Sequence, residues 1–275
     1  MKRWIGMFVW LLFAAMMYLI FAELVRHWIL LPTLGNVGFT LVFVMFSLGH
    51  CLVCEGLRRT SLFFILTSVI SYVLEEVGVR SGLVYGAYHY GAKLGPKLGS
   101  VPVLIPLAWF MMIYPSWIVA RALLRGVDTS SLFGLAAQAM VAAWVMSAWD
   151  AVMDPGMAAS GNWVWEYGGG YFGVPLRNYF GWLITTLLVF LGAGLLWRGK
   201  DKSSEVIDGF AALPIFIYAF YALSYVTPRG IPALQIVALF AMGFPALLAT
   251  MQVWARSIAP SESSSATEEA FDVVA

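Results

Sequence analysis

The sequence predicts an all-α integral membrane protein, a bundle of about eight transmembrane helices with an irregular or re-entrant loop rich in aromatic residues and glycine. Hydrophobic residues make up 61% of the 275 residues and charged residues only 11%, whereas soluble proteins carry about 25% charged residues. Apolar runs near the roughly 20 residues that a bilayer core requires recur along the chain. The segment 155–177 is too interrupted by glycine and proline for a spanning helix and too aromatic for an ordinary surface loop.

The predicted spanning helices begin close to the amino terminus. Met1-Lys2-Arg3 and the run from Trp4 to Ala22 are too long for a signal peptide, and Ile20-Phe21-Ala22 lacks the small residues of a cleavage site. Further runs fall at about 36–54, 61–79, 101–123, 131–153, 178–197, 206–226 and 231–254. Prolines lie within these runs, where neighbouring helices can satisfy the freed carbonyls. Residues 1–256 are therefore expected to form one polytopic membrane domain, and 257–275 a disordered acidic cytoplasmic tail.

The distribution of positive charge predicts the orientation. With the amino terminus in the cytoplasm, the cytoplasmic side receives ten of the sixteen lysines and arginines, as the positive-inside rule requires. A multi-pass protein of the cytoplasmic membrane with both termini inside is therefore expected. The net charge of +1 argues against a nucleic-acid partner. Cys51 and Cys54 lie within one helical turn and offer no disulfide framework.

Two aspartates stand out at the end of the apolar run 131–153. Asp150 and Asp154 are four residues apart and share one face of a helix until Pro155 ends it. Ionisable side chains at membrane depth are costly unless they are paired or face a polar cavity. The alternative is a helix-terminal pair that is solvated at the membrane surface. The apolar neighbours Trp149 and Met153 favour a position within the membrane over one at the solvated surface. A pair of aspartates at that depth is more readily explained by a function than by solvation.

Further polar residues are expected on the same side of the membrane. The run 61–79 ends there at the adjacent Glu75 and Glu76, of which helical geometry points only one inward. The two irregular connections, 80–100 and 155–177, lie there too. They carry His89, Lys93, Lys97, Glu166 and Arg177. By contrast, His50-Cys51-x-x-Cys54 lies at the opposite face without a fourth ligand, so a helix end is favoured over a metal site.

Two blocks of motifs identify a family resemblance. The first is AWDxxMDPxM, followed by W-x-W, GGYFGVP-L and N-x-x-GW. The second comprises Glu75-x-x-Gly78, Ser81-Gly82, Tyr85-Gly86-x-Tyr88-x-Tyr90, the stretch from Leu94 to Met112, and Tyr114-Pro115-Ser116. Both resemble the CruF-type membrane carotenoid 1,2-hydratases, a family that includes the bisanhydrobacterioruberin hydratases. Glu75 keeps the family spacing to Gly78 and is therefore preferred over Glu76.

The resemblance implies a hydro-lyase that adds water to the terminal isoprene C=C of an acyclic carotenoid, either a C40 lycopene or γ-carotene type or C50 bisanhydrobacterioruberin. Such chemistry needs a carboxylic acid that is still protonated near neutral pH, and burial or a second carboxylate nearby can supply one. Asp150 with Asp154 fits this requirement. A base must also take a proton from water, for which Glu75, Asp154 or Glu166 would serve.

The same resemblance implies aromatic faces around the carbocation, because a desolvated cation gains about 0.5–2 kcal/mol over an aromatic ring. The expected substrate-binding residues are Tyr85, Tyr88, Trp109, Trp149, Trp163, Trp165, Tyr171, Asn178 and Trp182. Further candidates are Glu76, His89, Glu166 and Arg177. Asn178 would hold the attacking water or cap the sixth helix. No cofactor and no metal are implied. The expected partners are the lipophilic carotenoid, water, membrane lipid and other enzymes of carotenoid biosynthesis.

Two other functions remain open at this point. Asp150-x-x-x-Asp154 has the spacing with which a membrane prenyltransferase holds Mg²⁺ on a diphosphate, although a second Asp-rich motif and a cluster of basic residues are missing. A proton-coupled transporter also uses intramembrane carboxylates, but paired broken helices in two inverted halves are not evident.

Overall fold

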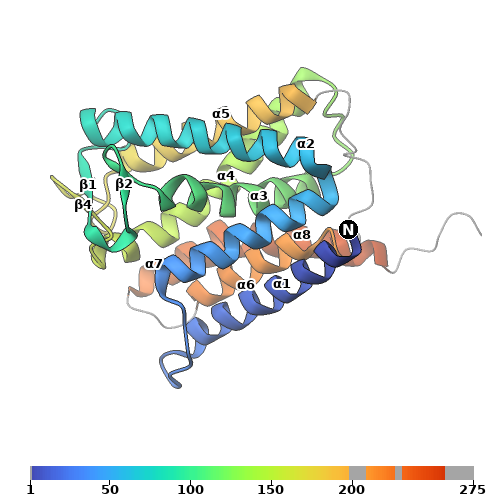
Figure 1. The fold of residues 1–275 in the computed structure, drawn as a ribbon, viewed down its shortest axis with the longest axis horizontal. Coiled ribbons are helices and arrows are strands. Elements are labelled where there is room, and N and C mark those ends of the chain that lie inside the picture. Colours follow the sequence, from blue (N-terminus) through green and yellow to red (C-terminus); the bar gives the residue numbers. More distant parts are fainter. Residues whose placement is uncertain (1, 198–208, 227–230, 258–275) are drawn as a thin grey trace, which may run out of the picture.

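The computed structural model describes residues 2–197, 209–226 and 231–257, and this part of the chain is a bundle of seven helices (Figure 1). The helices are α1 (Lys2–Val25), α2 (Gly35–Ser81), α3 (Leu104–Leu123), α4 (Leu132–Ala159), α5 (Leu176–Trp197), α6 (Leu213–Val226) and a last helix made of α7 (Pro232–Val237), the π-helical segment Ala238–Gly243 and α8 (Phe244–Ser257). Six of them are long and apolar enough to cross a membrane, and α6 is a shorter apolar helix. The expected tail lies, from residue 258 onward, outside the described residues.

The described part of the chain therefore holds seven helices as labelled rather than the predicted eight, because the runs 36–54 and 61–79 are the two arms of α2. The two arms meet at Gly56, whose backbone is not helical, so each predicted run is a helical arm of its own. Helix α2 bends sharply at Gly56, and its two arms are visible in Figure 1. Gly56 has φ 80° and ψ 166°, a backbone conformation that residues with a Cβ atom rarely adopt. Glu55 beside the bend pairs with Arg59 at 2.9 Å and with Arg121 of α3 at 2.8 Å.

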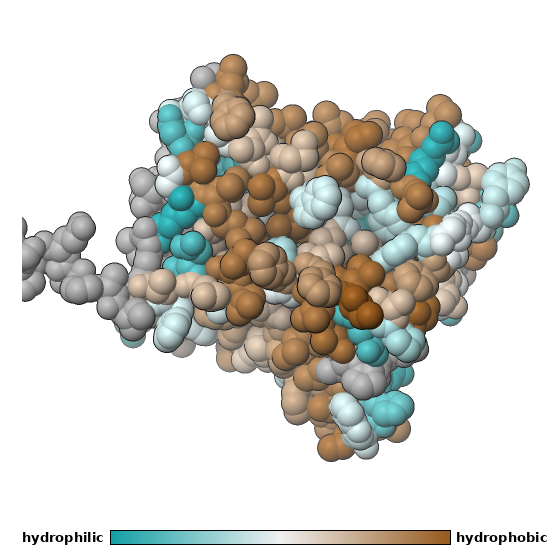
Figure 2. Space-filling model, turned by 180° about the vertical axis from the view of Figure 1, so that it is seen from behind, coloured by the Kyte–Doolittle hydropathy of each residue, from teal (hydrophilic) through white to brown (hydrophobic). Residues whose placement is uncertain are grey.

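The helices pack in two groups, with α1, α6 and α8 on one side and the second arm of α2 with α5 on the other (Figure 1). Between them, α3 is the most deeply buried span. Figure 2 shows the outer surface of one face, where hydrophobic side chains form a broad band and hydrophilic side chains gather toward the two ends of the helices. A surface of this kind suits a bilayer, since its apolar band can contact lipid while the polar ends reach water.

Prolines inside two helices leave carbonyl groups that other side chains satisfy, as the sequence predicted in general terms. Pro115 lies within α3 and cannot donate to the carbonyl of Met111. The Ser47 hydroxyl of α2 donates to that oxygen instead, at 2.8 Å. This bond fixes α2 against α3.

The prediction that Pro155 ends the helix of the two aspartates is wrong, because α4 continues to Ala159 with Pro155 inside it. Proline removes the hydrogen bond to the carbonyl four residues earlier, here Ala151. The Tyr171 hydroxyl donates to the Ala151 oxygen at 3.1 Å and replaces the lost bond. The helix therefore carries Asp150 and Asp154 in its interior rather than at its end.

The two connections expected to be irregular contain short strands. β1 (Tyr88–Tyr90) pairs antiparallel with β4 (Trp163–Trp165), and β2 (Lys97–Leu98) pairs with β3 (Val101–Pro102) after a short 3-10 turn, Ala92–Leu94. These strands lie at one end of the bundle, beside the carboxyl end of α2 and opposite the start of α1 (Figure 1). The two connections thus form a common cap over the helices.

Candidate active site

The β1–β4 pair forms the roof of the candidate site. Its register places Tyr88 opposite Trp165 and Tyr90 opposite Trp163. Because side chains alternate along a strand, these four aromatic residues share the inner face and are buried, whereas the central residue of each strand is exposed. The ring centroids of Tyr88 and Trp165 are 4.9 Å apart.

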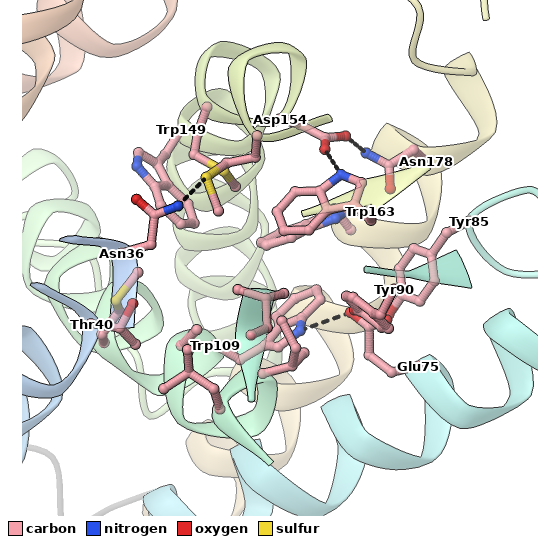
Figure 3. A pocket seen from close by; sticks show the side chains of 18 of the residues that line it. Asn36, Thr40, Glu75, Tyr85, Tyr90, Trp109, Trp149, Asp154, Trp163 and Asn178 are labelled. Carbon is pink, nitrogen blue, oxygen red and sulfur yellow. Dashed lines mark hydrogen bonds between the residues drawn. The ribbon is translucent and has the colours of Figure 1, made fainter. Parts of the chain in front are cut away.

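A cavity of about 110 Å³ lies beneath this roof (Figure 3). Two of its wall residues are carboxylic acids, Glu75 and Asp154. Ten of the other twenty wall residues are aromatic and come from the helices and from the cap: Phe39, Tyr85, Tyr88, Tyr90, Trp109, Trp149, Trp163, Trp165, Trp182 and Tyr221. Trp109 and Trp182 stack with their ring centroids 3.9 Å apart.

Glu75 is buried in one wall and accepts three hydrogen bonds. The hydroxyls of Tyr88 and Tyr90 both donate to Oε2, the latter at 2.7 Å. The indole N–H of Trp109 donates to Oε1 at 3.0 Å. Burial, followed by the charge of Glu75, raises the pKa of Tyr88 and of Tyr90 well above the usual value. Both phenols therefore remain donors throughout the physiological pH range.

Asp154 and Asp150 lie on another side and share one donor. The side-chain amide of Asn178 donates to Asp154 Oδ2 at 2.6 Å and to Asp150 Oδ2 at 3.1 Å. The indole N–H of Trp163 donates to Asp154 Oδ1. Both aspartates are almost fully buried, but only Asp154 lines the cavity. Among the described residues, Asp150 Oδ1 has no hydrogen-bond partner.

Most residues expected to bind substrate meet at this cavity. Its wall contains eight of the nine: Tyr85, Tyr88, Trp109, Trp149, Trp163, Trp165, Asn178 and Trp182. The ninth, Tyr171, does not line the cavity and supports α4 through the Ala151 carbonyl. Asn178 does not cap its helix, since its side chain contacts the two aspartates.

The four further candidates lie outside the cavity wall. Glu76 accepts from the backbone N–H of Ser100 at 2.8 Å and pairs with Arg80. His89 Nδ1 lies 2.5 Å from Glu166 Oε1 on the exposed face of the roof. The guanidinium of Arg177 is 3.4 Å from the carbonyl oxygen of Gly82. These contacts hold the cap together rather than face a substrate.

Two lysines of the first connection also hold the cap. Lys93 donates to the carbonyl of Ser160, and Lys97 donates to the carbonyl of Tyr90 at 2.7 Å. His50, at the other end of the bundle, contacts the Tyr114 hydroxyl at 2.7 Å and the Phe210 carbonyl at 2.8 Å. Both ring nitrogens of His50 thus have protein partners.

Sequence reasoning missed five polar or aromatic members of the wall. Tyr90 belongs to the Tyr88-x-Tyr90 pattern, and strand alternation would have placed it on the same face as Tyr88. Asn36, Phe39 and Thr40 come from the start of α2, and Tyr221 comes from α6. None of these four residues lies in a motif, so only the packing of the helices reveals them.

Comparison with known proteins gives two matches. A family model described as carotenoid biosynthesis protein matches residues 34–251. Bisanhydrobacterioruberin hydratase of Haloarcula japonica is 36% identical over 152 residues, which cover 52% of this chain and 50% of that protein. The matched region thus spans about half the length of this curated relative. No solved structure matches.

Proposed function

Because the chain belongs to the family of carotenoid biosynthesis proteins, we propose that it is a carotenoid hydratase, a hydro-lyase that adds water to the terminal C=C of an acyclic carotenoid. The observation that carries this proposal is one aromatic cavity with carboxyl groups in two of its walls, Glu75 and Asp154. Hydration of an unactivated alkene needs an acid that protonates the double bond and a base that takes a proton from the added water, both close to the same double bond. The name of the Haloarcula relative supports the same reaction class.

The aspartate pair is proposed as the acid. Two carboxyl groups within reach of one amide nitrogen repel each other when both are ionised, so the pair favours keeping a proton. Asp154, which lines the cavity, donates this proton to the less substituted alkene carbon. The π electrons form the new C–H bond, and a tertiary carbocation remains. Asp150 lies behind Asp154 and acts through it.

The aromatic wall and Glu75 are proposed to complete the reaction. Indole and phenol faces stabilise the cation by about 0.5–2 kcal/mol for each suitable contact. A water oxygen then bonds to the cationic carbon, and Glu75 takes the released proton. Glu75 Oε1 accepts only from Trp109 among the described residues, so a lone pair remains for the water. Return of this proton to the aspartate pair completes the cycle.

Expression in a host that makes an acyclic carotenoid tests the proposal. The wild type should yield products that have gained one or two molecules of water, seen by chromatography and mass spectrometry. Asp154→Asn and Asp150→Asn should each abolish them. Asp128→Asn is the matched control, since Asp128 is an exposed carboxylate in the connection between α3 and α4. Hydrated product from both active-site variants at the wild-type level would refute the acid assignment.

Magnesium dependence separates this reaction from prenyl transfer. No lysine or arginine is present among the described residues of the cavity wall, whereas a diphosphate is normally held by such cations. Hydration should therefore persist in membranes treated with EDTA. Loss of activity that Mg²⁺ restores would favour the prenyltransferase.

We also propose the cytoplasmic membrane as the location, with both termini inside. The distribution of lysine and arginine supports this orientation. The carboxyl groups would then lie toward the outer surface, where water reaches the membrane. Reporter fusions at the two termini test this orientation, and an outward signal from either terminus would contradict it.

A further inference from the structure

A second cavity of about 540 Å³ adjoins the first. It lies between the carboxyl ends of α1, α4 and α6 and the amino ends of α2 and α7. Residues that line both cavities form their common wall: Asn36, Phe39, Met153, Met157 and Tyr221. In Figure 3, Asn36 lies across the first cavity from Glu75. The second cavity therefore begins on the side away from Glu75.

The first cavity is too small for a carotenoid. An engineered apolar cavity of about 150 Å³ holds one benzene molecule, so about 110 Å³ accommodates little more than the end group of an isoprenoid. An extended polyene of this class is about as long as the hydrocarbon core is thick, roughly 30 Å. Most of the chain must lie elsewhere while its end group meets Asp154.

The wall of the second cavity suits an isoprenoid chain. Ten of its seventeen residues are aliphatic, methionine or aromatic, so most of the wall is apolar. Of its polar groups, Glu23 and Arg26 pair with each other at 3.4 Å. Gly156 in α4 opens the wall, since a Cβ at this position would meet nothing within 4 Å.

We propose that the second cavity binds the polyene body of an acyclic isoprenoid while its end group occupies the first cavity. The identity of this ligand rests on the proposed hydratase function. Phe39, Met153 and Met157 form the apolar passage between the two sites. The chain thereby enters the acid site from the side of α1, α6 and α7.

Filling the cavity is the first test. Gly156→Trp places an indole in the second cavity without a clash at Cβ. Changes in pocket shape of this kind alter rates by about tenfold or more, so hydration of the full-length carotenoid should fall by at least that factor. Gly6→Trp is the matched control, because Gly6 in α1 also has open space around a Cβ but lies outside both cavities. Equal hydration by the two variants would overturn the proposal.

Protection of a cysteine is the second test and needs no turnover. Gly156→Cys is treated with a maleimide in membranes from hosts that make, or lack, the acyclic carotenoid. Mass spectrometry of peptides separates this label from labels at Cys51 and Cys54. The carotenoid should slow labelling at 156 but not in a Gly6→Cys control. Labelling that is equally fast in both hosts would overturn the proposal, even if Gly156→Trp is inactive, because a water-filled entrance would give that pattern.

The two tests also separate this inference from the hydratase proposal. If the wild type yields hydrated carotenoid but Gly156→Cys is not protected, the polyene site is wrong and the reaction stands. If Gly156→Cys is protected but no hydrated product forms, the polyene site stands and the reaction is wrong.

Discussion

Removing the amide that joins the two aspartates is expected to inactivate the enzyme. Asn178→Leu keeps a side chain of similar size and deletes the donor to Asp154 at 2.6 Å and to Asp150 at 3.1 Å. Among the described residues, Asp150 would then lose its one side-chain hydrogen bond, and Asp154 would keep only the bond from Trp163.

The expected size of the effect follows from the two bonds. A hydrogen bond to a charged group contributes about 1.5–3 kcal/mol and an ordinary one about 0.5–1.5 kcal/mol. If the shorter bond belongs to the first class and the longer bond to the second, the two together contribute about 2–4.5 kcal/mol. Since about 1.4 kcal/mol corresponds to a tenfold change in rate, hydration should fall by a factor of roughly 30 to 1,600. The rate is measured as hydrated carotenoid formed per amount of protein in isolated membranes.

Thr185→Val is the matched control for this prediction. Thr185 lies on the same helix, is fully buried and bonds to the Tyr85 hydroxyl at 2.8 Å, without contact to either aspartate. Its loss should cost stability, about 1 kcal/mol, and change the rate less than about threefold. If Asn178→Leu folds and retains the activity of Thr185→Val, the aspartate pair is not the acid.

Three further predictions concern Glu75, the proline in α4 and alkaline pH. Tyr90→Phe removes one donor to Glu75 and should lower hydration about tenfold, because a bond to a buried charge contributes about 1.5 kcal/mol or more; an unchanged pigment yield per protein would contradict it. Tyr171→Phe leaves the Ala151 carbonyl without the donor that replaces Pro155. It should lower thermal stability in detergent by about 1 kcal/mol with hydration by the folded protein preserved. Because burial raises the pKa of Tyr90, the unfolded chain releases this proton at a lower pH than the folded protein. The free energy of unfolding should therefore be constant below about pH 10 and fall above it. In Tyr90→Phe this fall should be less steep. Thermal unfolding measured at a series of rising pH values tests both expectations.

Much of the fold and part of the site were predictable from the sequence because they depend on local patterns. Apolar runs of membrane-spanning length locate the helices, and the structure bears out an all-α membrane bundle. The helical period separates Glu75 from Glu76, and the structure places only Glu75 in the cavity wall. The spacing of Asp150 and Asp154 likewise puts both near one amide group.

The remaining features depend on contacts between distant segments. The helix passes through Pro155 because Tyr171 supplies the missing donor from the following connection. The two predicted runs 36–54 and 61–79 follow each other directly as the arms of α2, because Gly56 takes a non-helical backbone conformation and reverses the chain without a loop. β1 and β4 are short and pair across two connections, and no local pattern predicts which short segments will pair.

The pairing of β1 with β4 explains how one cavity can hold acids from separate helices. Each carboxyl group that lines it accepts hydrogen bonds from the roof and from a neighbouring helix. Glu75 accepts from Tyr88 and Tyr90 of β1 and from Trp109 of α3. Asp154 accepts from Trp163 of β4, and from Asn178 of α5.

Because the roof donates to both acids, it links the two walls of the cavity that carry them. Buried carboxyl groups are stable only with such partners, so a displaced roof would leave Glu75 with Trp109 alone and Asp154 with Asn178 alone, and would open the cavity to water. The site therefore depends on the pairing of two connections as much as on the helices that carry the acids. Substitutions that disturb this pairing without touching a carboxyl group, such as proline in place of Val164, should reduce hydration as strongly as loss of a donor.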